Sequence, residues 1–255
     1  MEQSKKLELI HIVEMINDIM KQHANNKRME TLANECLGVI ECLLNDKSVE
    51  RYQLKITKHK GKMEGIHSLS TYKYLSDTCL RLKSDEKNIC SKCYVDKTIA
   101  YAPQIELSLI YNTLLLRYAK LTKRQLPIIN DLYFRFESFS DLQNLQHLEN
   151  LYAIAKANPQ TQFALWTKNI TLLLKAKCPK NVNLILSSPR LNECLPLAET
   201  IIQAVKNRTG AKHVKVFSVY DSEHIQNQNC QKQCITCLKC YKKNDKTLLI
   251  SELLK

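Results

Sequence analysis

Between residues 130 and 220, apolar runs typical of buried strands alternate with stretches that have helical spacing, and this alternation constrains the fold most. The strand-like runs are 132–139, 162–167, 181–188 and 213–220. Strands that alternate with helices favour a parallel sheet with right-handed crossovers. We therefore predict an α/β fold, a TIM-like parallel β/α barrel that is complete or partial. An open doubly wound sheet is the alternative.

The three helices of this region have readable boundaries. Ser140 and Gln143 form a capping-box pattern, which predicts that a helix begins there and ends at Asn158-Pro159. A short helix is expected around 169–176. Asn192 is expected to cap the third helix, which should stop before Gly210.

The N-terminal region is helical in pattern. Residues 6–22 and 28–45 each place apolar side chains on one face, which predicts a helical hairpin. Residues 51–70 are basic and indicate a strand with loops, and a long helix should follow Pro103. The predicted domains are the hairpin 1–48, the β/α core 49–228 and a Cys-rich metal-binding segment 229–255.

Polar residues lie at the carboxyl ends of the predicted strands, where ligands bind in α/β folds. Ser187-Ser188 ends the third strand, and four charged groups lie at or just after the ends of the others: Glu137, Asp141, Lys168 and Asp221. Carboxylates and a lysine in such a mouth are candidate catalytic acids or bases, and they predict a small-molecule site. The alternative is that they serve as helix caps and ion pairs.

The chain has 11 cysteines among 255 residues. No run of about 18 apolar residues or signal sequence is found, so we expect a soluble cytoplasmic protein with no membrane contact. Cytosolic thiols stay reduced, and an odd count suits metal binding better than full pairing. Four cysteines are expected to be buried or incidental thiols: Cys36, Cys42, Cys178 and Cys194.

Four cysteines crowd into a polar, lysine-rich segment near the C-terminus: Cys230, Cys234, Cys237 and Cys240. Burial of these thiols as hydrophobic side chains is implausible there. Tetrahedral Zn²⁺ takes four thiolates, and so does a [4Fe–4S] cluster. Structural zinc sites usually separate two C-x₂-C pairs by a dozen residues or more, so this compact spacing favours iron–sulfur, with zinc as the alternative.

A second group consists of Cys79, Cys90 and Cys93. Three thiolates leave one metal position open, as reactive sites do. The alternative is that this group takes its fourth ligand from the C-terminal cysteines and forms one shared site. The sequence therefore predicts one or two [4Fe–4S] clusters.

The formal charge of +13 and the lysine runs suggest nucleic acid as a partner. The lysines concerned are Lys55, Lys58, Lys60, Lys62, Lys232, Lys239, Lys242, Lys243 and Lys246. A solvated lysine face explains the same runs. The four scattered glycines exclude Gly-rich dinucleotide and phosphate loops.

Several segments, in order, resemble the gene product 88 family of phages and plasmids. They are 61–80 with its Ser-Thr-then-Cys stretch, 88–103 with Cys93-Tyr94, 132–169, 181–193 and the closing Cys-x₂-Cys-x₂-Cys-aromatic run. The resemblance covers about 60–255 and implies an iron–sulfur protein with a barrel of the radical-SAM type. The sequence departs from the family at Phe139, where glycine is usual, and it lacks the short C-x₃-C-x₂-C loop of radical-SAM enzymes.

These observations predict an iron–sulfur protein in redox chemistry or electron transfer, with a redox partner. The alternative is a zinc-stabilised protein that binds nucleic acid. In a third interpretation, the N-terminal helices dock a partner.

Overall fold

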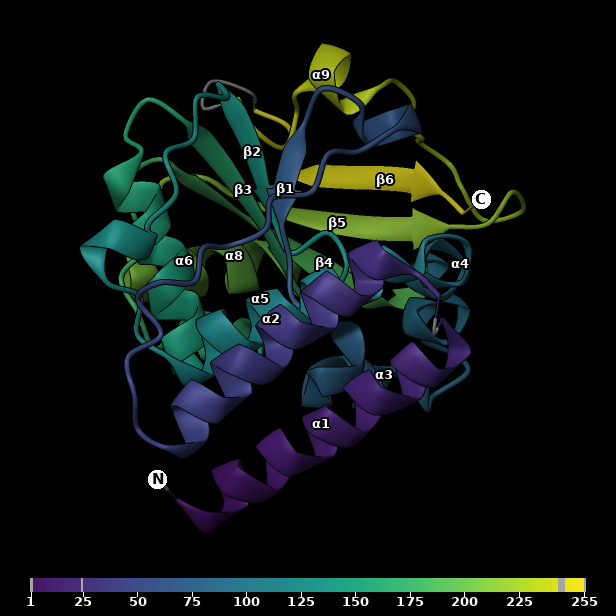
Figure 1. The fold of residues 1–255 in the computed structure, drawn as a ribbon. Coiled ribbons are helices and arrows are strands. Elements are labelled where there is room, and N and C mark those ends of the chain that lie inside the picture. The colour runs from purple at the N-terminus through teal and green to yellow at the C-terminus, as the bar shows by residue number, and fades with distance from the viewer. Residues whose placement is uncertain (1, 24, 243–245, 255) are drawn as a thin grey trace.

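A single parallel sheet organises the molecule (Figure 1). The computed structural model describes residues 2–23, 25–242 and 246–254. Six strands pair in the order of the sequence, and every pair is parallel. They are β1 (His67–Leu69), β2 (Tyr133–Phe136), β3 (Gln162–Thr167), β4 (Val182–Leu191), β5 (Val214–Tyr220) and β6 (Leu249–Leu253). The predicted parallel α/β class is confirmed.

Helices connect the strands and cover one face of the sheet (Figure 1). The α-helices are α1 (Gln3–Gln22), α2 (Lys27–Leu44), α3 (Asp77–Lys83), α4 (Tyr94–Tyr101), α5 (Pro103–Tyr118), α6 (Leu145–Ala157), α7 (Ile170–Leu173), α8 (Ala198–Thr209) and α9 (Cys234–Cys237). Short 3-10 turns are η1 (Gly61–Met63), η2 (Lys73–Leu75), η3 (Ile89–Lys92) and η4 (Lys123–Gln125). The predicted hairpin is confirmed as α1 and α2, and the predicted long helix after Pro103 is α5.

Alternate residues of the strands face the helices. Phe134 and Phe136 of β2 are fully buried there, and Phe136 stacks on Phe163 of β3 with ring centroids 4.7 Å apart. The same hydrophobic core contains Leu9 of α1 and Cys36 of α2. The hairpin therefore packs into the core of the β/α region.

The opposite face of the sheet carries the other set of alternate residues, and the C-terminal segment covers it. Tyr133, Trp166 and Ile185 form a second apolar cluster with Tyr241, which is almost fully buried. The tyrosine ring lies 6.0 Å from Trp166 and 5.8 Å from Tyr133, measured between centroids. We call this surface the inner face.

The segment before β1 contacts the other edge strand through a side chain. Lys62, in η1 just before β1, forms an ion pair with Glu252 of β6. No pairing of β1 with β6 occurs among the described strands, so closure into a barrel stays a prediction. The doubly wound alternative requires a reversal of strand order, and this order runs without one.

Two predicted helix starts are wrong. Helix α6 begins at Leu145, capped by Asn144, because the carboxylate of Asp141 instead holds the loop before it. Asn192 has a left-handed backbone and bonds to the end of β5, so α8 starts six residues later. The sequence also gave no sign of β6, whose five residues are too few to show a period. None of the described helices is both long enough and apolar enough to cross a membrane.

Candidate functional site

Three predicted ligand cysteines, Cys79, Cys90 and Cys93, lie on the connection between β1 and β2, and we call them the mouth thiol group. Cys79 lies in the first turn of α3, where its amide donates to the hydroxyl of the capping residue Ser76 over 3.3 Å. Cys90 lies in η3, and Cys93 is the residue that precedes α4. Three separate elements thus carry the three thiols.

A charged cluster joins α3 and α4 to η2. The carboxylate of Asp96, on α4, binds the ammonium of Lys73, accepts from the hydroxyl of Tyr74, and lies 3.2 Å from the ammonium of Lys83 on α3. Lys73 is only 3% exposed. The hydrogen bonds of Lys73, Tyr74 and Lys83 hold the pKa of Asp96 at about 2, although burial opposes them, so this carboxylate remains charged.

Two of the predicted catalytic residues, Asp141 and Lys168, lie beside the mouth thiol group. The Asp141 carboxylate is buried, where it accepts from the hydroxyl of Thr167 and from the amide of Lys168 over 2.8 Å. It therefore ties the loop after β2 to the end of β3. The sulfur of Cys79 lies 4.0 Å from the hydroxyl of Ser140, next to this carboxylate.

Asp141 and the three thiols change the pKa of Lys168, as close neighbours do. Burial lowers the pKa of Lys168, but Cys90, Asp141, Cys79 and Cys93 outweigh burial and raise it. Burial and the Asp141 carboxylate raise the pKa of Cys79 to about 12, against the effect of Lys168. The lysine is thus a cation among three thiols, and the aspartate is fixed close by.

The other four predicted ligands lie together on the C-terminal segment, and we call Cys230, Cys234, Cys237 and Cys240 the C-terminal thiol group. The amide of Cys230 donates to the carbonyl of Ser251 in β6 over 3.1 Å. Cys234 and Cys237 are the first and last residues of the single turn α9. That turn packs near η1, where Gly65 approaches Ile235 (Figure 1).

The inner face of the sheet anchors Cys240. Buried Asn183 of β4 donates from its amide nitrogen to the carbonyls of Cys240 (3.0 Å) and Tyr241 (2.8 Å). The ammonium of Lys215, on β5, donates to the carbonyl of Lys239 over 2.6 Å. Polar residues of two inner strands therefore hold the backbone of the cysteine segment.

The four C-terminal thiols affect one another. Burial raises the pKa of Cys240, and Cys230 and Cys234 raise it further. Burial likewise raises the pKa of Cys230, and Cys237 adds to this effect. Two cations act in the opposite direction, Lys62 on Cys230 and Arg135 on Cys234 and Cys240.

Different cations act on the two thiol groups. The mouth thiol group neighbours Lys168 and Asp141, and the C-terminal thiol group neighbours Lys62 and Arg135. All 11 cysteines are free thiols. Within the described ranges, no three His, Cys, Asp or Glu side chains could hold a metal ion as they stand. The chemistry of the donor sets, four thiols and three thiols, suits iron–sulfur ligation.

The remaining two catalytic candidates lie elsewhere. Glu137 is buried behind the strand end, where its carboxylate accepts from the amide of Thr71 (3.2 Å) and lies 3.2 Å from Nε2 of His147. Asp221 is in the turn after β5, where hydrogen bonds from Asn192 and His224 lower its pKa to about 2. The structure therefore brings only Asp141 and Lys168 together with the cysteines.

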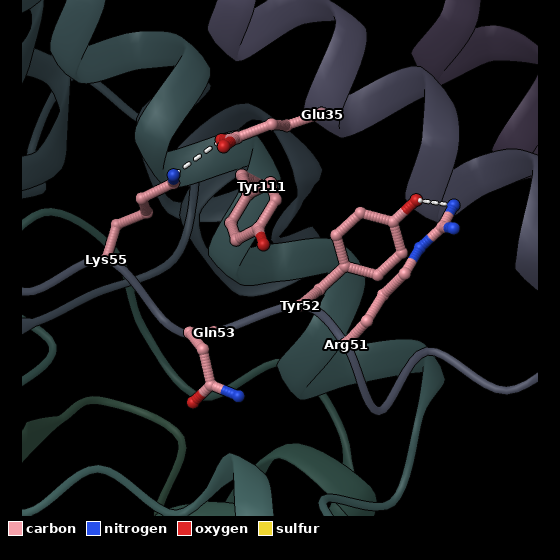
Figure 2. A pocket seen from close by; sticks show the side chains of 6 residues that line it. All are labelled: Glu35, Arg51, Tyr52, Gln53, Lys55 and Tyr111. Atoms are coloured by element: carbon pink, nitrogen blue, oxygen red, sulfur yellow. Dashed lines mark hydrogen bonds and ion pairs between the residues drawn. The ribbon is translucent and has the colours of Figure 1, made fainter.

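Two pockets lie outside the mouth. One of about 310 Å³ lies on the helical side, among α2, α5 and residues 51–55 (Figure 2). Its charged groups are already paired, since Lys55 binds Glu35 at 2.5 Å and Arg51 donates to the hydroxyl of Tyr52 (Figure 2). The other, of about 370 Å³, opens beside Cys237 and is lined by amides and lysines.

Cys36 and Cys42 are buried in the core, as predicted, whereas Cys178 and Cys194 are only partly buried. Reasoning from sequence missed the supporting residues Asn183, Tyr241 and Arg135. A charged residue among the aromatic residues of β2 was a readable signal for Arg135, since a buried strand seldom carries one. The predicted nucleic-acid contact Lys243 lies outside the described residues.

Comparisons with known proteins give one match. A family model described as Gene product 88 matches residues 44–244, more than three quarters of the chain. The matched segment begins at the end of α2 and includes both thiol groups. No curated protein and no solved structure matches.

Proposed function

The chain belongs to the gene product 88 family, and from this premise we propose that it binds iron–sulfur clusters and acts in redox chemistry or electron transfer. One observation carries the proposal: four free thiols lie within one eleven-residue segment, and two of them, Cys234 and Cys240, pack against the apolar cluster of the inner face. Four cysteine thiolates are the usual ligands of a [4Fe–4S] cluster.

The surroundings of the C-terminal thiol group support an anionic centre. Lys62 donates to the carbonyl of Cys230 over 3.1 Å, and Lys239 donates to the carbonyl of Asn229 over 2.9 Å. Arg135 and Lys215 both favour the thiolate of Cys240. Four thiolates bound to iron carry net negative charge, and nearby cations offset the cost of holding that charge away from water.

The mouth thiol group is the proposed site of a second cluster. Its three cysteines would hold three metal positions and leave a fourth for a small molecule at the strand ends. Lys168 would orient an anionic group of that molecule, and Asp141 would keep the lysine backbone in place through the 2.8 Å bond to its amide. When bound, a cluster would supply one-electron chemistry.

Metal and sulfide analysis tests the proposal. Protein purified without oxygen should be brown, absorb broadly near 400 nm and contain iron and acid-labile sulfide in equal amounts. About four irons per chain would indicate one cluster, and about eight would indicate two. A colourless protein with stoichiometric zinc would overturn the proposal and leave the zinc alternative.

Cysteine variants separate the two groups. Cys234→Ser with Cys237→Ser should remove the signal of one cluster in electron paramagnetic resonance, and Cys90→Ser with Cys93→Ser should remove the other. Cys194→Ser is the matched control, since this partly buried cysteine belongs to neither group. Iron retained in full by both double variants would contradict the assignment of ligands.

A further inference from the structure

Arg135 is a charged residue within β2, the strand next to the edge strand β1. It stands in β2 between Phe134 and Phe136, which both face the helices. The alternation of the strand therefore turns Arg135 to the inner face, where its guanidinium carbon lies 3.9 Å from the ring centroid of Trp166. The side chain is held by a flat aromatic surface on the face that the cysteine segment covers.

This guanidinium has no oxygen acceptor among the described residues. Its Nε is buried without a hydrogen-bond partner, and its Nη1 reaches only the sulfur of Met63 at 3.4 Å. A thioether is a weak acceptor. The side chain is only partly exposed. Holding a cation partly away from water without a counter-charge costs free energy, and stacking on Trp166 returns about 1–2 kcal/mol of that cost.

The C-terminal thiol group lies on the same face as this guanidinium. Arg135 contacts Trp166 and Met63, and both belong to the apolar cluster against which Cys234 and Cys240 pack. A thiolate on either cysteine would supply the missing negative charge. Lys168 is the cation that neighbours the mouth thiol group.

We propose that Arg135 is the counter-charge of the C-terminal thiol group and that it sets the reduction potential of the centre held there. Reduction adds negative charge to the centre, so a fixed cation stabilises the reduced state more than the oxidised state. Arg135 acts through the ligands and is a positioning residue. This inference rests on the proposed cluster.

The test compares reduction potentials in the full-length protein. Arg135→Met keeps the apolar stem and removes the charge, so the equilibrium constant for reduction should fall at least about tenfold, or about 59 mV for a one-electron couple. Arg135→Lys keeps the charge and should stay within about threefold of the parent. Lys156→Met removes an equal charge from the exposed end of α6 and should change nothing.

The outcomes separate this inference from the proposed function. A variant Arg135→Met with normal iron and sulfide but an unchanged potential overturns the inference alone. Protein without iron or sulfide overturns the proposed function. In that case the affinity of the C-terminal thiol group for Co²⁺ tests the inference. Arg135→Met should bind Co²⁺ at least about tenfold more weakly than the parent, and equal affinity would overturn the inference. Should Arg135→Met fail to fold, the neutral Arg135→Gln replaces it in both arms.

Discussion

The two thiol groups are built in opposite ways. The C-terminal thiol group lies on one short segment whose backbone is held by Asn183 and Lys215 of the sheet. The mouth thiol group is spread over three elements, and side chains around Asp96 join two of them, α3 and α4. One group depends on the rigid sheet, and the other depends on a cluster of charges.

This difference fits two different tasks. Under the proposed function, four thiols on a fixed backbone would make a saturated centre, which suits electron transfer because its geometry would change little. Three thiols on separate elements, beside a lysine and an aspartate, leave room for a ligand and for adjustment. The predictions below ask whether the two groups fail independently.

Tyr241→Ala should have the largest effect. Tyr241 is 1% exposed and packs on Trp166 and Tyr133, so its removal leaves a cavity under the cysteine segment. We expect a loss of about 3–5 kcal/mol in the free energy of unfolding. Chemical denaturation measures this loss. Iron at the C-terminal thiol group should also fall more than iron at the mouth thiol group, which the two signals in electron paramagnetic resonance would show.

Tyr241→Phe is the matched control for that variant. The hydroxyl of Tyr241 is buried without a partner among the described residues. Its removal should therefore leave stability unchanged or raise it by about 1 kcal/mol, with full metal content. Equal damage from Tyr241→Phe and Tyr241→Ala would mean that the hydroxyl, and not the packing of the ring, anchors the segment.

Asp96→Asn should act on the other group. The substitution leaves Lys73 buried without its counter-charge, and we expect a loss of about 2–3 kcal/mol. Occupancy of the mouth thiol group should fall while the C-terminal signal persists. Lys83→Met, at a partly exposed position of the same cluster, should cost less than about 1 kcal/mol. Loss of both signals together would show that the two groups form one unit.

The sequence predicted the sheet better than its surroundings. Buried parallel strands are continuous apolar runs, so β3 was predicted at its observed bounds and β5 to within one residue. The predicted helix start at Asn192 failed because its side chain bonds to Asp221 instead. The start at Ser140 failed because the Asp141 carboxylate binds the amides of Leu142 and Lys168 and holds a loop there. A capping pattern reports a local preference only, whereas the bonds of Asp141 and Asp221, which lie outside the helices, determined where α6 and α8 begin.

The cysteines of the site were readable because their spacing is local. The residues that support them were not readable, since Lys215, Asn183 and Arg135 lie on strands 25 to 105 residues before Cys240 in sequence. Only the register of the sheet brings such residues beneath the C-terminal segment. The sequence also could not show that the candidate acids lie in different places. Glu137 and Asp141 are four residues apart, yet Glu137 binds the amide of Thr71 and Asp141 binds the amide of Lys168.

A fall in pH should weaken the strand ends near the mouth. His59 bonds to the hydroxyl of Ser68 (2.7 Å) and stacks on Phe139, and burial, together with Arg135 and His67, lowers its pKa from 6.5 to about 4. The unfolded chain therefore takes up this proton first, and stability is lost as pH falls from 6.5 to 4. The shift sets a maximum of about 3 kcal/mol, and partial exposure of the ring reduces the expected loss to about 2 kcal/mol.

Denaturation at pH 4 and pH 7 measures that loss, and His59→Gln provides the comparison. Glutamine does not titrate. Between pH 7 and pH 4 the free energy of unfolding of the variant should therefore fall by about 2 kcal/mol less than that of the parent. An identical pH profile in the variant and the parent would assign the acid sensitivity to other groups.

The smallest effect is expected where η1 meets α9. Gly65 has φ +81°, and a Cβ there would lie 3.4 Å from Cγ1 of Ile235, an ordinary van der Waals distance. Gly61 has φ +65° and no neighbour within 4 Å. Alanine at either position should cost about 1 kcal/mol through its left-handed backbone, and the two variants should differ by less than about 0.5 kcal/mol in thermal unfolding. A larger loss for Gly65→Ala, with less metal at the C-terminal thiol group, would mean that contact with η1 supports α9 as strongly as the sheet supports Cys240.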